Sequence, residues 1–148
     1  LPQSVNIGEE FEVYMGVDPG VRLEYLSPKR YMSEKPKSLF NRSKVKKCEV
    51  ERRIIIKNNR AGAIRIHVED QVPRSETKDI EIELLQPSKV KTKDESNLAP
   101  NMQNVTCLNE KNNLEWINWT IQPKQTEQFT IKYSVQWSEH VKLDPNIL

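Results

Sequence analysis

The sequence predicts an all-β protein, an antiparallel β-sandwich of the immunoglobulin-like type with about seven strands. Apolar and polar residues alternate without a break over 129–137, which is the pattern of a strand with one buried face. The same alternation recurs over 50–56, 64–68 and 80–84. Turn-forming and Pro-containing segments separate these runs, so hairpins with one crossover between two sheets are the simplest way to connect them.

The first two strands are expected over 10–15 and 21–26. An Asp-Pro-Gly turn at 18–20 reverses the chain between them, because Pro presets φ and Gly accepts a positive φ. In the second strand the apolar residues Val21, Leu23 and Tyr25 occupy every other position and therefore face together.

Two further strands are expected over 48–57 and 64–69. Asn and Gly residues at 58–62 join them, and these residue types tolerate the left-handed conformations of a tight connection. We expect the two strands to form a hairpin.

The second half of the chain begins with a connection over 70–75. Pro73 cannot donate to a ladder, so we expect the chain to cross there to the other sheet. A strand over 79–85 precedes a polar, aperiodic segment over 86–112, which is typical of a long flexible loop. The apolar pattern of the next strand slips by one residue near Asn118, which predicts a β-bulge.

The 148 residues form one predicted domain over 1–148, with a basic loop at 28–47. The longest apolar run has three residues, too few to span a membrane. Cys48 and Cys107 could form one disulfide or remain thiols. Three glycosylation sequons permit secretion, whereas the sparse cysteines favour a reducing cytoplasm, and we favour the cytoplasm.

Six segments spread over most of the chain carry a family resemblance: Gly8-Glu9-Glu10-Phe11, Gly16-Val17-Asp18, 52–59, Asp70-Gln71-Val72-Pro73 with Ser75, Leu114-Glu115-Trp116, and Tyr133-Ser134-Val135. Together they resemble the C-terminal domain of unknown function of the mucoidy inhibitor A-like protein family. Arg74 departs from the small aliphatic residue that the family usually carries there. The resemblance implies the C-terminal part of a larger protein, with another domain and a coiled-coil-like segment upstream. It implies no reaction, because the family has no established biochemical activity.

Catalytic and metal constellations are not evident in the sequence. His67 and His140 lack a neighbouring nucleophile motif, and the two His and two Cys lack the short spacings typical of zinc sites. We therefore expect no enzyme, no cofactor and no small-molecule substrate.

The segment Asp70-Gln71-Val72-Pro73 has two interpretations. Asp70 and Gln71 could present a carboxylate and an amide to a ligand at a sheet edge. We favour the structural interpretation, in which Asp70 accepts backbone N–H groups at the crossover and Pro73 fixes the chain there. Asp70, Gln71 and Pro73 are thus predicted as a structural motif.

Charge is concentrated in one segment, 28–47, which holds eight cations against the single acid Glu34. Clustered cations can attract phosphate-rich surfaces, and Tyr31 and Phe40 could add stacking or insertion. The alternative is a solvated loop that faces the protein's own acidic surface. The candidate residues for binding an anion or a partner are Lys29, Arg30, Lys35, Lys37, Arg42, Lys44, Lys46 and Lys47.

These observations lead to two hypotheses of different classes. The first is a non-enzymatic interaction or assembly module of a larger multidomain protein, which binds a protein partner or self-associates through sheet edges. The second is an adaptor for anionic surfaces, acidic lipid or nucleic acid, that uses the basic segment at 28–47.

Overall fold

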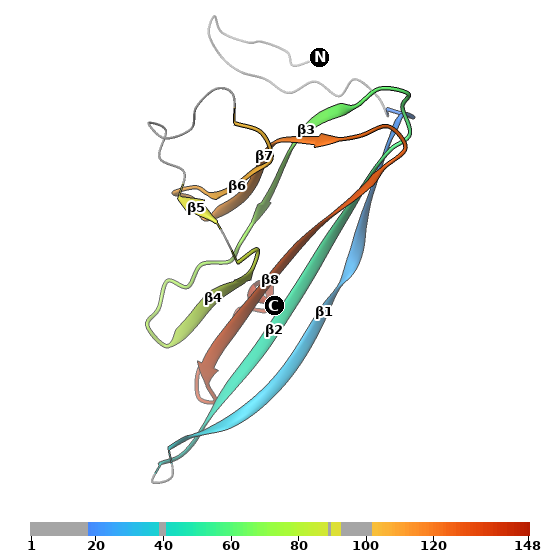
Figure 1. The fold of residues 1–148 in the computed structure, drawn as a ribbon. Helices are drawn as coiled ribbons and strands as arrows, with labels where there is room; N and C mark the ends of the chain where they lie inside the picture. Colours follow the sequence, from blue (N-terminus) through green and yellow to red (C-terminus); the bar gives the residue numbers. More distant parts are fainter. Residues whose placement is uncertain (1–17, 39–40, 89, 93–101) are drawn as a thin grey trace, which may run out of the picture.

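The structure is a computed structural model that describes residues 18–38, 41–88, 90–92 and 102–148. These residues form two four-stranded sheets and one short 3-10 helix, so the predicted all-β sandwich is confirmed (Figure 1). The sheets have the strand orders β1-β2-β8-β4 and β3-β7-β6-β5, and the pairing is antiparallel except between β5 and β6. The elements are β1 Val21–Ser38, β2 Asn41–Asn58, β3 Ile64–Gln71, β4 Ile80–Gln86, β5 Lys91–Thr92, β6 Val105–Leu108, β7 Asn113–Ile121, β8 Thr126–Ser138 and η1 Pro145–Ile147.

The core lies where the two sheets face each other. Alternate residues of β2 and β8 point toward the second sheet, and among them Ile54 and Ile131 are almost completely buried. From β7, the Trp116 ring meets Phe129 of β8 edge-on, with 5.2 Å between ring centroids. Leu114, also of β7, is fully buried beside this pair. The period-2 pattern therefore identified the buried faces of β2 and β8.

The hairpin predicted between 48–57 and 64–69 is wrong. β2 pairs with β1 and β8, whereas β3 pairs with β7 in the other sheet. Asn58 makes this change of sheet possible, because its fully buried amide donates to the carbonyls of Gly62 at 2.9 Å and Ile121 at 3.0 Å. The alternation of apolar and polar residues predicts a strand, but it does not identify the strand with which it pairs.

Two predicted loops contain strands. Most of the basic loop expected at 28–47 is strand, because β1 and β2 continue as one long antiparallel pair to Ser38 and Asn41. Pro28 sits in a register shift of the edge strand β1, where its missing N–H removes no ladder hydrogen bond. The loop expected at 86–112 contains β5 and β6, although 93–101 lies outside the described residues.

Two other expectations are confirmed. The segment 70–75 crosses between the sheets, since β3 and β4 belong to different ones. The bulge is present as well: Ile66 pairs with Trp119 but Val68 pairs with Trp116, so β7 has one extra residue. Asn118 in this bulge has a φ of 51°. The strand expected over 10–15 lies outside the described residues.

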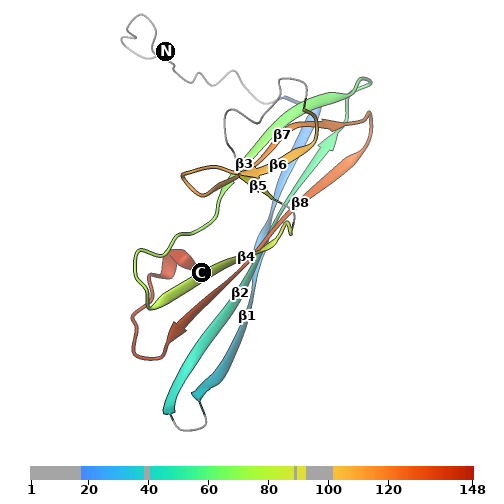
Figure 2. The ribbon, with the colours of Figure 1, turned by 60° about the vertical axis from the view of Figure 1, so that its left-hand side comes forward.

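The far half of the β1–β2 hairpin extends beyond the second sheet, as Figures 1 and 2 both show. We call residues 29–38 and 41–51 the arm. The C-terminal segment returns to its base, where the Tyr133 hydroxyl donates to the Ile147 carbonyl at 2.9 Å. The helix η1 is thereby held against the face of β8 that continues the core.

Candidate interaction surface on the β1–β2 arm

All eight cations predicted as a binding site belong to the arm, but the strands divide them between two faces. Arg30 and Lys46 are in register with Val50 and Glu34 on the inner face, which continues the core-facing side of β2. Lys29, Lys35 and Lys47 lie on the outer face. Lys44 follows the inner-face alternation of β2, and for Lys37 and Arg42 the structure describes the strand but not the side chain.

On the inner face, two of the cations have partners within the chain. The Arg30 Nε donates to the Leu148 carbonyl at 2.5 Å, which links β1 to the C-terminal segment. Lys44 Nζ lies 3.7 Å from a carboxylate oxygen of Glu34 across the hairpin. These contacts lower the number of cations that could meet an external anion.

On the outer face, Glu49 is the centre of an ion-pair group. Its carboxylate lies 3.0 Å from Lys132 Nζ of β8 and 3.8 Å from Lys47 Nζ. The hydrogen bond from Lys132, more than the charge of Lys47, lowers the pKa of Glu49, and the same hydrogen bond raises the pKa of Lys132. Lys29 and Lys35 are exposed and have no ion pair with any residue that the structure describes.

Exposed large apolar side chains distinguish β1 from the other strands. Tyr31 is 52% exposed on the outer face and Met32 is 59% exposed on the inner face. Nearer the second sheet, Leu23 and Tyr25 are 54% and 66% exposed. The sequence predicts Leu23 and Tyr25 on one face, and their register with Ile56 and Ile54 confirms this. Both are exposed because β1 is the edge strand of its sheet among the described residues.

The predicted structural motif links the two sheets. Asp70 Oδ1 accepts the backbone N–H of Gln71 at 2.8 Å and lies 3.3 Å from Arg52 Nη1 of β2. The other guanidinium nitrogen, Nη2, donates to the Gln71 carbonyl at 2.6 Å. Pro73 follows, and its carbonyl accepts from the Asn112 side chain at 3.3 Å. The sequence singled out Asp70 but not Arg52, which lies in a strand and has no distinguishing motif.

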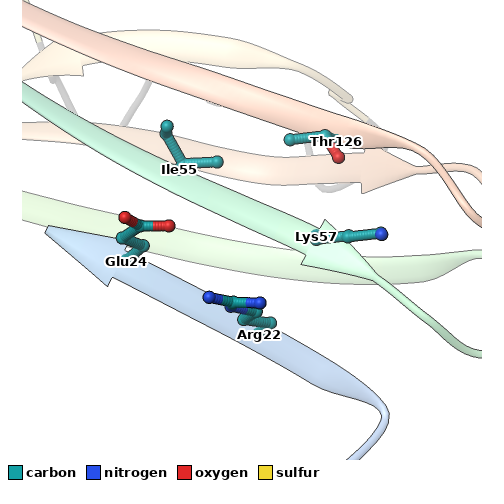
Figure 3. Close-up of a pocket in the computed structure, with 5 residues that line it drawn as sticks. All are labelled: Arg22, Glu24, Ile55, Lys57 and Thr126. Carbon is teal, nitrogen blue, oxygen red and sulfur yellow. The ribbon is translucent and has the colours of Figure 1, made fainter. Parts of the chain in front are cut away.

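A hollow on the outer face of the first sheet is small. Its volume is about 170 Å³, and Figure 3 shows its lining side chains on β1, β2 and β8. Small-molecule sites usually enclose about 300–1,000 Å³. The lining residues are Arg22, Glu24, Ile55, Lys57 and Thr126.

Cys48 and Cys107 are buried thiols in different sheets. Burial raises the pKa of the Cys48 thiol, which keeps it protonated and a poor nucleophile at neutral pH.

A comparison with known families assigns the chain to a protein family. Residues 1–139 match the family described as "Domain of unknown function (DUF4139)". The chain belongs to this family. The DUF4139 domain is also similar to "Protein F37C4.5" of Caenorhabditis elegans, with 28% identity over 132 residues. That alignment covers 88% of this chain and 22% of the nematode protein, so the chain spans less than a quarter of its relative's length.

Two further findings describe the DUF4139 domain. No solved structure matches it. In the part of the chain that the structure describes, no helix combines the length and the apolar character that crossing a membrane requires.

Proposed function

We propose that this domain is a non-enzymatic interaction module that binds a protein partner through the arm and the adjoining part of β1. The observation that carries the proposal is the exposure of Leu23, Tyr25, Tyr31 and Met32 along one edge strand. Large apolar and aromatic side chains are enriched where proteins meet, and their burial supplies most of the binding energy.

The charges of the arm favour a protein partner over a phosphate-rich surface. Arg30 and Lys44 have partners within the chain, and Lys47 shares Glu49 with Lys132. Each face of the arm thus has charges of both signs beside an exposed apolar side chain, Tyr31 on the outer face and Met32 on the inner face, which suits a protein interface with a polar rim. A purely anionic ligand would have to compete with Glu34 for Lys44 and with Glu49 for Lys47.

Binding by strand addition is restricted to part of β1. Pro28 and Pro36 interrupt the edge, and register shifts flank both positions. Prolines and bulges are devices that protect sheet edges from pairing with another chain. The partner therefore contacts the side-chain faces of the arm, and strand pairing is limited to the two stretches of β1 that the prolines leave, 21–27 and 29–35.

A second candidate is the adaptor for anionic surfaces. It is favoured by the outer face alone, where Lys29 and Lys35 are exposed on either side of Tyr31. Three side chains in this order could place an aromatic ring between two phosphate contacts. Salt-dependent binding to anionic vesicles or to mixed nucleic acid, lost in Lys29→Glu/Lys35→Glu but not in the exposed-site control Lys78→Glu, would favour this candidate.

The absence of catalysis is part of the proposal. It is supported by the protonated state of the buried Cys48 thiol. The length of the nematode relative supports a place within a larger protein, and the resemblance to the mucoidy inhibitor A-like proteins supports a C-terminal position. A cytoplasmic location is consistent with the two thiols, which form no disulfide with each other.

The apparent size of the longer protein that carries this domain tests the proposal. In extracts of its source, the wild type should elute together with a partner in gel filtration. The double variant Tyr31→Ser/Met32→Ser should elute at its own mass, because it removes exposed apolar area without touching the core. Gln128→Ala, at an exposed position of β8 remote from the arm, is the matched control. Unchanged co-elution of the double variant would refute the proposed surface.

A further inference from the structure

Three potential metal ligands converge on the outer face of the second sheet, away from the arm. His67 and Glu69 belong to β3 and Glu115 belongs to the neighbouring β7. We propose that these three side chains bind a divalent transition-metal ion of the zinc type.

The fold explains why the three side chains meet. His67 and Glu69 are two positions apart on one strand and so point to the same side of the sheet. Glu69 is paired directly with Glu115 across β3 and β7. His67 is opposite the bulge of β7, between the paired positions Ile66 and Val68.

The distances are close to those that a metal requires. His67 Nε2 lies 3.6 Å from Glu115 Oε2, and the potential ligand atoms of all three residues lie within 4.8 Å of one another. For metal–ligand bonds of 2.0–2.2 Å in tetrahedral geometry, neighbouring ligand atoms are about 3.4 Å apart. The His67–Glu115 pair already has this spacing, and the carboxylate of Glu69, within 4.8 Å of the other two ligand atoms, would move closer to complete the set.

Two asparagines orient the carboxylates. Asn113 Nδ2 donates to Glu69 Oε1 at 2.6 Å, and Asn109 Nδ2 donates to Glu115 Oε1 at 2.7 Å. The Asn109 amide is itself fixed, because its Oδ1 accepts the N–H groups of Lys111 and Asn113. One oxygen of each carboxylate is therefore anchored by an asparagine, as outer-shell partners anchor the ligands of metal sites.

The energetics of the sheet also favour a cation here. Glu115 is only 3% exposed, and burying a carboxylate is costly. Like charges directly opposite each other on neighbouring strands add to that cost. A dication between Glu69 and Glu115 would reduce the repulsion between the two carboxylates, while the half-exposed His67 leaves a path from solvent. A nitrogen ligand with two carboxylates suits zinc better than calcium or magnesium, which prefer oxygen ligands.

Calorimetric titration of the metal-depleted 148-residue chain with zinc chloride tests the site. One zinc ion should bind per chain, and His67→Ala and Glu69→Gln should each weaken the affinity by at least about tenfold. The control is His140→Ala, because His140 Nε2 also lies 3.6 Å from a glutamate, Glu139, but among the residues that the structure describes neither belongs to a group of three potential ligands. This variant should bind zinc like the wild type.

A second readout separates loss of the ligand from loss of the fold. Far-ultraviolet circular dichroism of metal-free Glu69→Gln should match that of the metal-free wild type, and its thermal midpoint should be no lower, since Glu69 is exposed and the substitution removes the like charge opposite Glu115. Zinc should raise the midpoint of the wild type but not that of Glu69→Gln. The proposal is overturned if the folded wild type takes up no zinc, or if His67→Ala and Glu69→Gln bind zinc as tightly as His140→Ala.

Discussion

The link between the two sheets at Asp70 provides the sharpest prediction of stability. Asp70→Ala removes the acceptor of the Gln71 N–H at 2.8 Å and the ion pair with Arg52 at 3.3 Å. Both side chains are largely buried, at 19% and 27% exposure, so the pair is only partly screened by water. Arg52 retains its hydrogen bond to the Gln71 carbonyl and its position 5.5 Å from the Tyr133 ring centroid. We therefore expect a loss of about 1–2 kcal/mol, in the lower part of the range for a broken part-buried charge pair.

Urea denaturation followed by tryptophan fluorescence measures this loss. Asp70→Asn should cost less than Asp70→Ala, because the amide oxygen can still accept the Gln71 N–H. Arg52→Met preserves packing against Tyr133 and removes the buried Arg52 Nε, which has no hydrogen-bond partner in the structure. The double variant then gives the coupling energy, expected at about 1 kcal/mol. A free energy of unfolding within a few tenths of a kcal/mol of wild type for Asp70→Ala would refute the reasoning.

Two other predictions concern the bulge and the ion pairs of the arm. Asn118 has a φ of 51°, and its side chain donates to the Met102 carbonyl. Asn118→Val should be less stable than Asn118→Gly by about 1–3 kcal/mol, because both variants lose that hydrogen bond but only valine is strained at this φ. Equal unfolding midpoints of the two variants in urea would contradict this prediction. Because Lys132 lowers the pKa of Glu49 from 4.5, the pair stabilises the fold above that pH and the contribution is lost as the pH falls through the lowered value. The difference in thermal midpoint between wild type and Glu49→Gln should shrink below about pH 4.5, and a difference that does not change with pH would count against the pair.

The sequence allowed most strands to be predicted because one face of each is buried. Residues 129–137 in β8 alternate for this reason, and the phase slip near Asn118 correctly predicted the bulge. The partners of the strands could not be predicted in the same way. The hairpin expected between β2 and β3 fails because the buried Asn58 amide turns the chain into the other sheet, a tertiary interaction that no local pattern records.

The candidate site was harder to predict. The side chains of 28–35 are exposed on both faces of the arm, so this stretch has no alternation of apolar and polar residues and its sequence is typical of a loop. Strand geometry then divided its cations between two faces. The sequence does not indicate the three potential metal ligands, because Glu115 is remote in sequence from His67 and Glu69. The pairing of β3 with β7 brings them together.

Photo-cross-linking from the arm tests the central claim most directly. A benzophenone amino acid would replace Tyr31 in the longer protein that carries this domain, and Lys78 in the exposed connection before β4 would serve as the control position. The account predicts one discrete cross-linked protein from position 31 and none from position 78. Cross-links from position 31 no more specific than those from position 78 would contradict it.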